Sequence, residues 1–296
     1  MAEIMRKAQK QLESASGVFS FFGGKEDKYE QAVDLYIQAA ASFRVQKQFQ
    51  QAGQAYEKAA EIRKNNLGQI PDATQALIEA YKSYSAGNDL ANASRCLETI
   101  VEHYITKGDF RQAANYEDKL GDLYAEGVDP SDPAACQRAI TAFRTAADWM
   151  RQDNAQALAK KADLKAGDLA AKIGDYDTAI EIYEQAAMVD LNSTVRFTAY
   201  KWFNRVIICL LAKDDDVAVN KALGEFMNLD PAFQNSMEFR LLLKLMPVMG
   251  EKDLSRFELE FGDGDKNPGA VEVVDPWVRS MLPRLRLICE QEEDLS

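Results

Sequence analysis

Residue types that carry catalysis are sparse in this chain, which holds one histidine and four cysteines. His103 has no serine or cysteine nucleophile motif around it, and acid–base catalysis needs partners within hydrogen-bond reach. The cysteines, at positions 96, 136, 209 and 289, form no CxxC pair and have no histidine beside them, which excludes the usual zinc spacings. We therefore expect His103 and the cysteines to be structural, and we predict no catalytic residue, no metal site and no cofactor.

A run of carboxylates, Asp214-Asp215-Asp216, has the chemistry of a cation site. It lacks the glycine turn and the distal glutamate of an EF-hand loop. Because the positive end of a helix dipole stabilises acidic side chains, we favour the first turn of a helix for this triplet. The chain also has no P-loop and no GxGxxG motif, so it carries no nucleotide-binding signature.

Basic side chains recur along a chain whose formal net charge is -12. This acidic balance argues against nonspecific nucleic-acid binding, which needs a basic surface, and is compatible with a basic protein partner. The recurring cations form three groups: Arg44 with Lys47; Lys160, Lys161 and Lys165; and Lys201 with Arg205. Their spacing alone fits both solvated polar faces and a track for an extended acidic ligand.

The elements that must position these residues are indicated by a repeated pattern, A-x-x-x-[YF]-x-x-A-A. It occurs four times, starting at Ala32, Ala52, Ala139 and Ala179, and a weaker copy starts at Ala93. The spacings i, i+4, i+7 and i+8 place these residues on one face of a helix. The first two copies start 20 residues apart and the last two 40 apart, which is typical of tetratricopeptide-like helical hairpins.

We therefore predict an all-α fold, a tetratricopeptide-like right-handed superhelix of antiparallel helical hairpins with a C-terminal helical bundle. About 14 helices are expected over residues 2–262, with turns at Gly108-Asp109 and Gly174-Asp175, and a last helix follows Asp275-Pro276-Trp277. The predicted domains are residues 1–200, a twisted sheet of hairpin repeats, and residues 201–296, a helical bundle that ends in an acidic tail. No signal-peptide pattern and no membrane-spanning apolar run is found, so we expect a cytoplasmic protein.

An aromatic stretch, SGVFSFFGG at residues 16–24, stands between the glycines of a predicted loop. Its four large apolar residues either plug the first hairpin or contact an apolar partner outside the chain. The first repeat starts at Ala32 and already has its aromatic residue in Tyr36, which favours the external contact. These four residues are Val18, Phe19, Phe21 and Phe22.

Several segments together resemble one family, the soluble NSF attachment proteins. They are the aromatic stretch, AIEIYEQAA at 179–187, DPAF at 230–233, and the ending PWVRSMLPRLRLICEQEEDLS. The similarity spans essentially the whole chain and is greater to the alpha type and its fungal vesicle-fusion counterpart than to the gamma type. The resemblance implies an adaptor without bond chemistry of its own. In that family several copies wrap a four-helix SNARE complex and present it to NSF, a hexameric AAA ATPase that unwinds the complex after membrane fusion.

The resemblance also implies residue roles on the SNARE side. The SNARE-contacting cations of the family correspond to Arg44, Lys47, Lys161 and Lys165, and, with an offset of one residue, to Lys201. Two further basic positions of the family are Asp109 and Asn115 in this chain. This departure falls in the middle of the expected binding face, and Arg111 is the candidate that compensates for it.

Two further contacts are implied by the resemblance. The apolar loop of the family touches the membrane that carries the SNAREs, so the aromatic stretch implies peripheral membrane association. The acidic C-terminus and its penultimate leucine engage and activate NSF. The corresponding residues are Glu292, Glu293, Asp294 and Leu295.

One alternative from a different class stays open, a generic helical-repeat scaffold that captures peptide tails. Such a scaffold needs a compact carboxylate clamp in one groove. In this chain the cations are instead spread over residues 44–205. A comparison of SNARE complex with short C-terminal peptides as ligands discriminates the two hypotheses.

Overall fold

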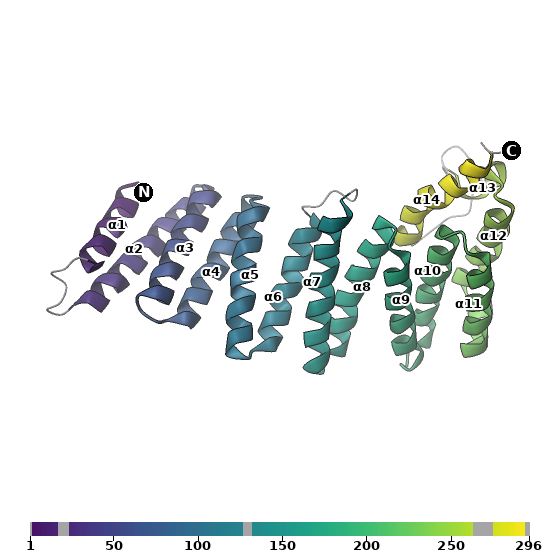
Figure 1. The fold of residues 1–296 in the computed structure, drawn as a ribbon, viewed down its shortest axis with the longest axis horizontal. Helices are drawn as coiled ribbons and strands as arrows, with labels where there is room; N and C mark the ends of the chain where they lie inside the picture. The colour runs from purple at the N-terminus through teal and green to yellow at the C-terminus, as the bar shows by residue number, and fades with distance from the viewer. Residues whose placement is uncertain (1, 17–23, 127–131, 263–274, 294–296) are drawn as a thin grey trace. The chain divides into compact units, whose positions relative to one another are not determined.

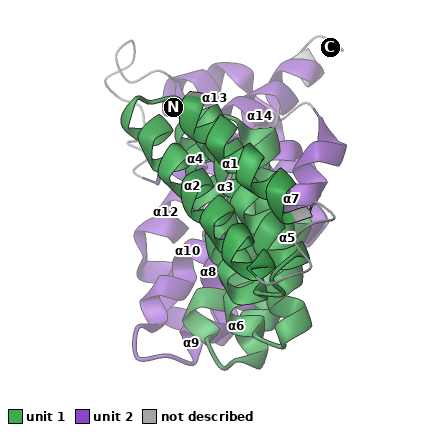
Figure 2. Cartoon of the chain, turned by 90° about the vertical axis from the view of Figure 1, so that its left-hand side faces the viewer, with its two compact units in different colours: residues 1–129, 141–159 green, residues 130–140, 160–296 purple. Residues whose placement is uncertain are grey.

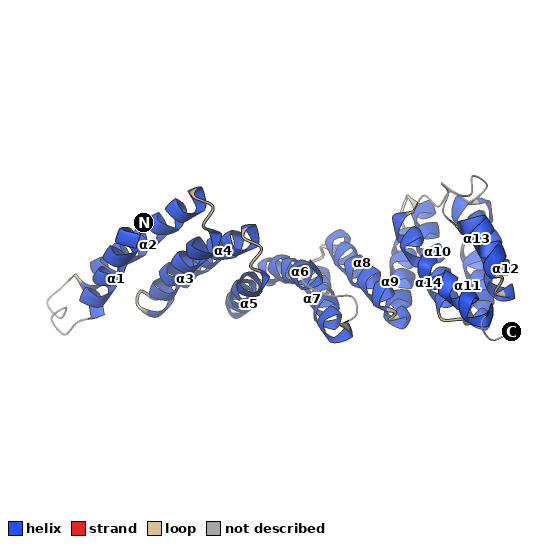
Figure 3. Ribbon diagram, turned by 90° about the horizontal axis from the view of Figure 1, so that it is seen from above, coloured by secondary structure: helices blue, strands red, loops and turns tan. Residues whose placement is uncertain are grey.

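The computed structural model describes residues 2–16, 24–126, 132–262 and 275–293 (Figure 1). Within these ranges the chain forms 14 α-helices, two short 3₁₀ helices and no strand (Figure 3). This confirms the predicted all-α fold of tetratricopeptide-like hairpins. In the described part, 13 of the α-helices precede residue 262, one fewer than the approximate number expected, and the last one follows Asp275 as predicted.

The chain divides into two compact units, residues 1–129 with 141–159 and residues 130–140 with 160–296 (Figure 2). The first unit contains α1 (Ala2–Ser16), α2 (Lys25–Val45), α3 (Phe49–Asn65), α4 (Ile70–Ala86), α5 (Leu90–Lys107) and α6 (Phe110–Glu126). Helices α7 (Pro133–Gln152) and α8 (Gln156–Ile173) each cross the division. The second unit continues with α9 (Tyr176–Leu191), η2 (Arg196–Thr198), α10 (Ala199–Ala212), α11 (Asp216–Leu229), η3 (Pro231–Asn235), α12 (Met237–Glu251), α13 (Leu254–Phe261) and α14 (Pro276–Glu293). The predicted domain boundary at residue 200 stays a prediction.

Short turns end one helix and start the next. Gly108 and Gly174 adopt left-handed backbone conformations, with φ of 76° and 85°, which glycine reaches without steric cost. The aspartates that follow them cap the next helix: Asp109 accepts the backbone N–H of Gln112, and Asp175 accepts that of Thr178. Both predicted turns are confirmed. Such turns let α1 to α6 pack on one another in chain order as antiparallel neighbours (Figure 1).

The small-aromatic stripe of each repeat is buried, as predicted. In the first copy Ala32, Tyr36, Ala39 and Ala40 expose at most 2% of their surface. The buried members of the other full copies are Ala52, Tyr56, Ala59, Ala60, Ala139, Phe143, Ala146, Ala147, Ala179, Tyr183, Ala186 and Ala187. The weaker copy that starts at Ala93 is buried as well. Small side chains on this stripe let neighbouring helices approach, and the aromatic ring fills the space between them.

Glycine allows an even closer approach between α3 and α4. A Cβ atom added to Gly53 would lie 2.5 Å from Cζ of Tyr84. The Tyr84 ring is 1% exposed, and its hydroxyl donates a hydrogen bond to Oε2 of Glu57 at 2.6 Å. Because the ring is held at both its buried edge and its hydroxyl, the missing side chain of Gly53 fixes the separation of the two helices.

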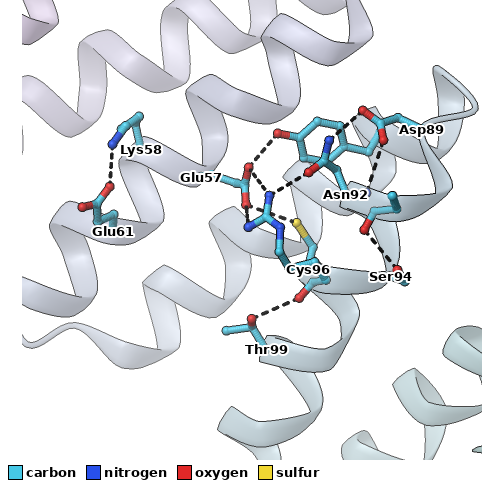
Figure 4. Close-up of polar contacts among 11 residues, drawn as sticks. Glu57, Lys58, Glu61, Asp89, Asn92, Ser94, Cys96 and Thr99 are labelled. Carbon is cyan, nitrogen blue, oxygen red and sulfur yellow. Dashed lines mark hydrogen bonds and ion pairs between the residues drawn. The ribbon is translucent and has the colours of Figure 1, made fainter.

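The Glu57 carboxylate also joins a third helix to this pair (Figure 4). It forms an ion pair of 2.7 Å with Arg95 and accepts the thiol of Cys96 at 3.7 Å, both from α5. Burial, reinforced by the negative charge of Glu57, raises the pKa of Cys96 to about 12, so this thiol stays protonated at neutral pH. All four cysteines are buried and none forms a disulfide, which agrees with the structural role predicted for them.

Helix α10 forms the centre of the second unit. Thirteen of its 14 residues are buried, and it packs against α9, α11, α12 and α14. Phe203 stacks on Phe226 of α11 with a centroid distance of 4.1 Å and meets Phe233 of η3 edge to face. Helix α14, which packs on α10, continues through Pro283 to Glu293. The extensive burial of α10 explains why its sequence is richer in large apolar residues than those of the repeat helices.

The α3–α4 contact gives a stability prediction. We expect Gly53→Ala to destabilise the protein by about 1–3 kcal/mol, because the added methyl group overpacks against Tyr84. Gly224→Ala in α11 is the matched control, since a Cβ atom there has no neighbour within 4 Å. That control gains about 0.5–1 kcal/mol from helix propensity. Urea denaturation followed by circular dichroism measures both, and equal stabilisation of the two variants would contradict the fixed position of Tyr84.

Candidate functional site

The histidine lies in a buried hydrogen-bond network on α5, not in an acid–base site. His103 is 8% exposed, and its Nδ1 lies 2.9 Å from Oγ1 of Thr74, which itself donates to the carbonyl of Ile70. Its Nε2 lies 3.0 Å from Nζ of Lys64. The Thr74 hydroxyl uses its own proton for Ile70, so its oxygen accepts a hydrogen bond from Nδ1–H of His103. Lys64 donates to Nε2. Nδ1 therefore carries the proton, and the ring is neutral. Burial, and next the charge of Lys64, lowers the pKa of His103.

The carboxylate triplet starts a helix, as predicted. Asp215 caps α11 and accepts the backbone N–H of Ala218 at 2.9 Å. Asp214 instead binds Nζ of Lys252 at 2.9 Å, and Asp216 is the first residue of α11. Across the described ranges no group of three or more histidine, cysteine or acidic side chains has the geometry of a metal site.

The first candidate cations lie at the end of α2. Nη1 of Arg44 binds Oε2 of Glu79 in α4 at 2.7 Å, and Nζ of Lys82 binds the other oxygen of the same carboxylate at 2.6 Å. Lys47 is exposed in the turn after α2, and in the part of the chain that the structure describes its side chain forms no ion pair. Two cations thus share the Glu79 carboxylate, and Lys47 presents a further positive charge in the turn after α2.

The second group, on α8, separates into structural and exposed lysines. Nζ of Lys160 binds Oδ1 of the buried Asp190 at 2.5 Å, and Oδ2 of Asp190 accepts the indole N–H of Trp202 at 2.7 Å. Lys160 is therefore part of the core of the second unit. Lys161 is exposed and Lys165 is half-buried. Their spacing of four residues places these two on the same face of α8.

The third group, on α10, corrects one expectation from the sequence. Nζ of Lys201 lies 3.9 Å from Oδ2 of Asp275, and the side chain is 46% exposed. Arg205, one turn later, is only 4% exposed, because aromatic rings enclose its guanidinium group. The sequence-based grouping of the two as surface cations is right for Lys201 and wrong for Arg205.

The departure at Asp109 has a local structural reason. Its carboxylate caps α6, so an acidic residue stabilises the start of that helix. Nε of Arg111 binds Oδ2 of Asp153 at 2.6 Å, and the Arg111 side chain is 70% exposed. Arg111 presents its charge to solvent next to a carboxylate that partly neutralises it. Compensation by Arg111 for Asp109 and Asn115 stays a prediction.

The structure brings candidate residues together within each unit. Arg44 and Lys47 lie in the first unit, and Lys161, Lys165 and Lys201 lie in the second. The four apolar residues of the N-terminal stretch, Val18, Phe19, Phe21 and Phe22, are outside the described residues. So are Asp294 and Leu295, whereas Glu292 and Glu293 belong to the last turn of α14 with side chains outside the description.

Comparison with known proteins identifies the family. A family model described as "Soluble NSF attachment protein, SNAP" matches residues 1–287. This chain belongs to the soluble NSF attachment proteins. It is 34% identical to a "Probable vesicular-fusion protein sec17 homolog" of Neurospora crassa, over 98% of this chain and 97% of that protein.

Relatives named for the alpha type match over a similar length. The "Alpha-soluble NSF attachment protein" of Saccharomyces cerevisiae is 31% identical over 99% of this chain and 97% of its own. The human protein of the same name is 26% identical over 99% of this chain and 96% of its own. The family resemblance found in the sequence is confirmed. Among the described residues, no helix has both the length and the apolar character needed to cross a membrane.

The neutral His103 network predicts a pH effect on stability. The pKa of His103 is lower in the folded chain than in the unfolded chain, so the unfolded chain binds more protons as the pH falls below about 6.5. The contribution of neutral His103 to the free energy of unfolding is therefore fully present above that pH. It is lost as the pH falls toward the pKa of His103 in the folded chain. Urea midpoints of wild type and His103→Gln, measured at pH 7.5 and pH 5, test this expectation. The difference between the two proteins should shrink at pH 5, and a constant difference would contradict the neutral assignment.

Proposed function

We propose that this protein is an adaptor that binds assembled SNARE complexes and recruits and stimulates the ATPase NSF, which disassembles them in vesicle fusion and intracellular transport. The observation that carries this proposal is the family match over residues 1–287. Similarity over 97% of the length of the relatives from Neurospora crassa and Saccharomyces cerevisiae supports it. In this helical scaffold the histidine, the cysteines and Asp215 take part in packing or in starting helices. Such an arrangement fits an adaptor better than an enzyme.

Exposed positive charge supports the SNARE side of the proposal. SNARE bundles are acidic on their surface in this family of complexes, and both units of this acidic chain present exposed cations. Each such contact is weak and is screened by salt, so the interaction gains strength from several contacts and several adaptor copies. We assign SNARE binding to Arg44, Lys47, Lys161, Lys165 and Lys201.

These five residues differ in how available their charge is. Lys47 and Lys161 are exposed and form no ion pair within the described ranges, so a partner carboxylate meets a whole positive charge there. Arg44 and Lys201 each have a carboxylate neighbour, at 2.7 Å and 3.9 Å. A SNARE carboxylate must share these two cations with Glu79 and Asp275. Lys47 and Lys161 are therefore the sharpest positions for a test.

We assign the two ends of the chain to the other partners. Val18, Phe19, Phe21 and Phe22 provide the peripheral membrane contact, since each buried phenylalanine contributes about 1.5–3 kcal/mol before ordering costs. Glu292, Glu293 and Asp294 meet a basic surface of NSF, and Leu295 activates the ATPase. The membrane contact then holds the adaptor at the surface that carries its SNARE substrate, which raises the effective concentration for binding.

The proposal is tested by a disassembly reaction. Purified SNARE complex, NSF and ATP are combined with and without this protein, and release of SNARE monomers is followed by loss of fluorescence transfer between labelled subunits. We expect release only when all components are present. Release no faster than in the adaptor-free reaction would overturn the proposal.

Charge reversal at the exposed lysines gives a residue-level prediction. The double variant Lys47→Glu with Lys161→Glu should bind SNARE complex about tenfold more weakly at low salt and with a shallower salt dependence, because two attractive contacts become repulsive. Binding is measured by pull-down over a range of sodium chloride concentrations.

The matched control for this variant is Lys7→Glu with Lys221→Glu. These lysines are also exposed, one lies in each unit, and the change in net charge is identical. The control should stay within about twofold of wild type. If both pairs weaken binding equally, net charge and not the assigned residues governs the interaction.

The aromatic stretch gives a prediction that separates membrane contact from a core plug. Phe21→Ser with Phe22→Ser should slow disassembly of SNARE complexes anchored in liposomes by about tenfold or more, while disassembly of soluble complexes stays near wild type. The two substrates are compared in the same fluorescence assay. Equal loss on both substrates, or a lowered melting temperature, would identify the stretch as part of the core.

A further inference from the structure

Arg205 is a buried cation that the proposed binding surfaces do not use. Its Nη1 donates to Oδ1 of Asp168 in α8 at 2.5 Å, and its Nη2 lies 3.7 Å from Oδ1 of Asp275, the residue just before α14. Its Nε has no acceptor among the described residues. A buried charge is costly unless it is paired, so the two carboxylates offset the cost of burying the Arg205 guanidinium group.

Three aromatic rings enclose the same guanidinium group. Its Cζ atom lies 5.4 Å from the ring centroid of Tyr183, 5.2 Å from that of Trp202 and 4.7 Å from that of Trp277. All three distances are within the range of a cation–π interaction. Tyr183 stacks on Trp202 and meets Trp277 edge to face, so the rings also hold one another.

The positions of these rings are fixed by further hydrogen bonds. The hydroxyl of Tyr183 donates to Oδ1 of Asp168 at 2.7 Å, the same oxygen that Arg205 binds. The indole N–H of Trp202 donates to Asp190 at 2.7 Å. We call this cluster the Arg205 clamp; its members are Asp168, Tyr183, Trp202, Arg205, Asp275 and Trp277.

The clamp connects the two helices to which different partners are assigned. Asp168 follows Lys161 by seven residues and Lys165 by three, so all three lie on one stripe of α8. Asp275 and Trp277 form the start of α14, whose last turn contains Glu292 and Glu293. At 1.5 Å per residue, the 16 steps from Trp277 to Glu293 extend over about 24 Å.

Beyond the clamp, the start of α14 borders an open groove. The groove has a volume of about 710 Å³ and lies between the α8–α9 turn and α14. Its lining includes Asp168, Lys172, Tyr176, Trp277, Ser280 and Arg284. The clamp lies at one edge of this groove, since Asp168 and Trp277 belong to both.

We propose that Arg205 is a positioning residue that holds α14, the helix that leads to the NSF-activating residues, in a fixed orientation on the SNARE-binding helix α8. This inference rests on the proposed function. Because α8, α9, α10 and α14 all contact one guanidinium group, the clamp transmits force or movement between α8 and α14. Lysine cannot replace it, since a single ammonium group neither reaches two carboxylates in a fork nor offers a planar, delocalised cation to the surrounding aromatic rings.

The first test is hydrogen exchange of the free protein, which needs no partner. Arg205→Met should speed exchange of the α14 amides by about tenfold or more, and Arg205→Lys should give a smaller increase with the fold intact. Lys213→Met is the matched control, because Lys213 also joins the end of α10 to α9 through an ion pair, and among the described residues it forms no hydrogen bond or ion pair with α14. Unchanged α14 exchange in both Arg205 variants, or an equal increase across α9, α10 and α14, would overturn the proposal.

The second test is the disassembly reaction at saturating adaptor. For Arg205→Lys we expect SNARE binding within about twofold of wild type and a maximal rate of stimulated disassembly lowered about fivefold, since the coupling and not the contact is lost. Loss of SNARE binding in parallel, or a normal maximal rate, would overturn the positioning role. If wild type itself supports no disassembly, the proposed function fails while the exchange comparison still decides whether the clamp holds α14.

Discussion

The close approach of neighbouring helices is the constraint on which the rest of this structure depends. It requires small residues where backbones meet and one aromatic ring per contact to fill the remaining space, as Gly53 and Tyr84 show between α3 and α4. Because α1 to α6 each pack on their neighbours in sequence, this rule can be repeated along the first unit. The outer faces of the helices are then available for charge.

The same packing explains how the reactive residue types are used in the described part of the chain. His103, Cys96 and Asp215 are each engaged in joining or starting helices, through Thr74 and Lys64, through Glu57, and through the first turn of α11. Burial shifts the pKa of His103 and of Cys96 toward the neutral form, which favours packing over reactivity. The function proposed above accordingly uses exposed side chains and the two ends of the chain.

The second unit follows a different principle, in which charge lies inside an aromatic cluster. Lys160 and Arg205 are both basic and both are bound to carboxylates of neighbouring helices, at 2.5 Å in each case. These ion pairs also help to orient Trp202, Tyr183 and Trp277. A stripe of small residues makes no such directional contact. A chain that only stacked hairpins would leave α14 held by apolar contacts that tolerate sliding, whereas directional contacts to Arg205 specify its orientation.

The helical class, the repeat stripe and the turns at Gly108 and Gly174 could be predicted from the sequence, because residue spacing and turn chemistry are local properties of the chain. The family could be predicted from segments of the sequence as well. The spacing of the cations did not distinguish Lys161 from Lys160, or Lys201 from Arg205, since neighbouring cations on a helix look alike until their partners are placed; only the family resemblance selected Lys161 and Lys201. Asp168 and Asp190 gave no signal in the sequence, as a carboxylate at a helical position is usually solvated. Only the tertiary structure, by setting α8, α9, α10 and α14 around one guanidinium group, decided which charges are exposed and which hold the fold together.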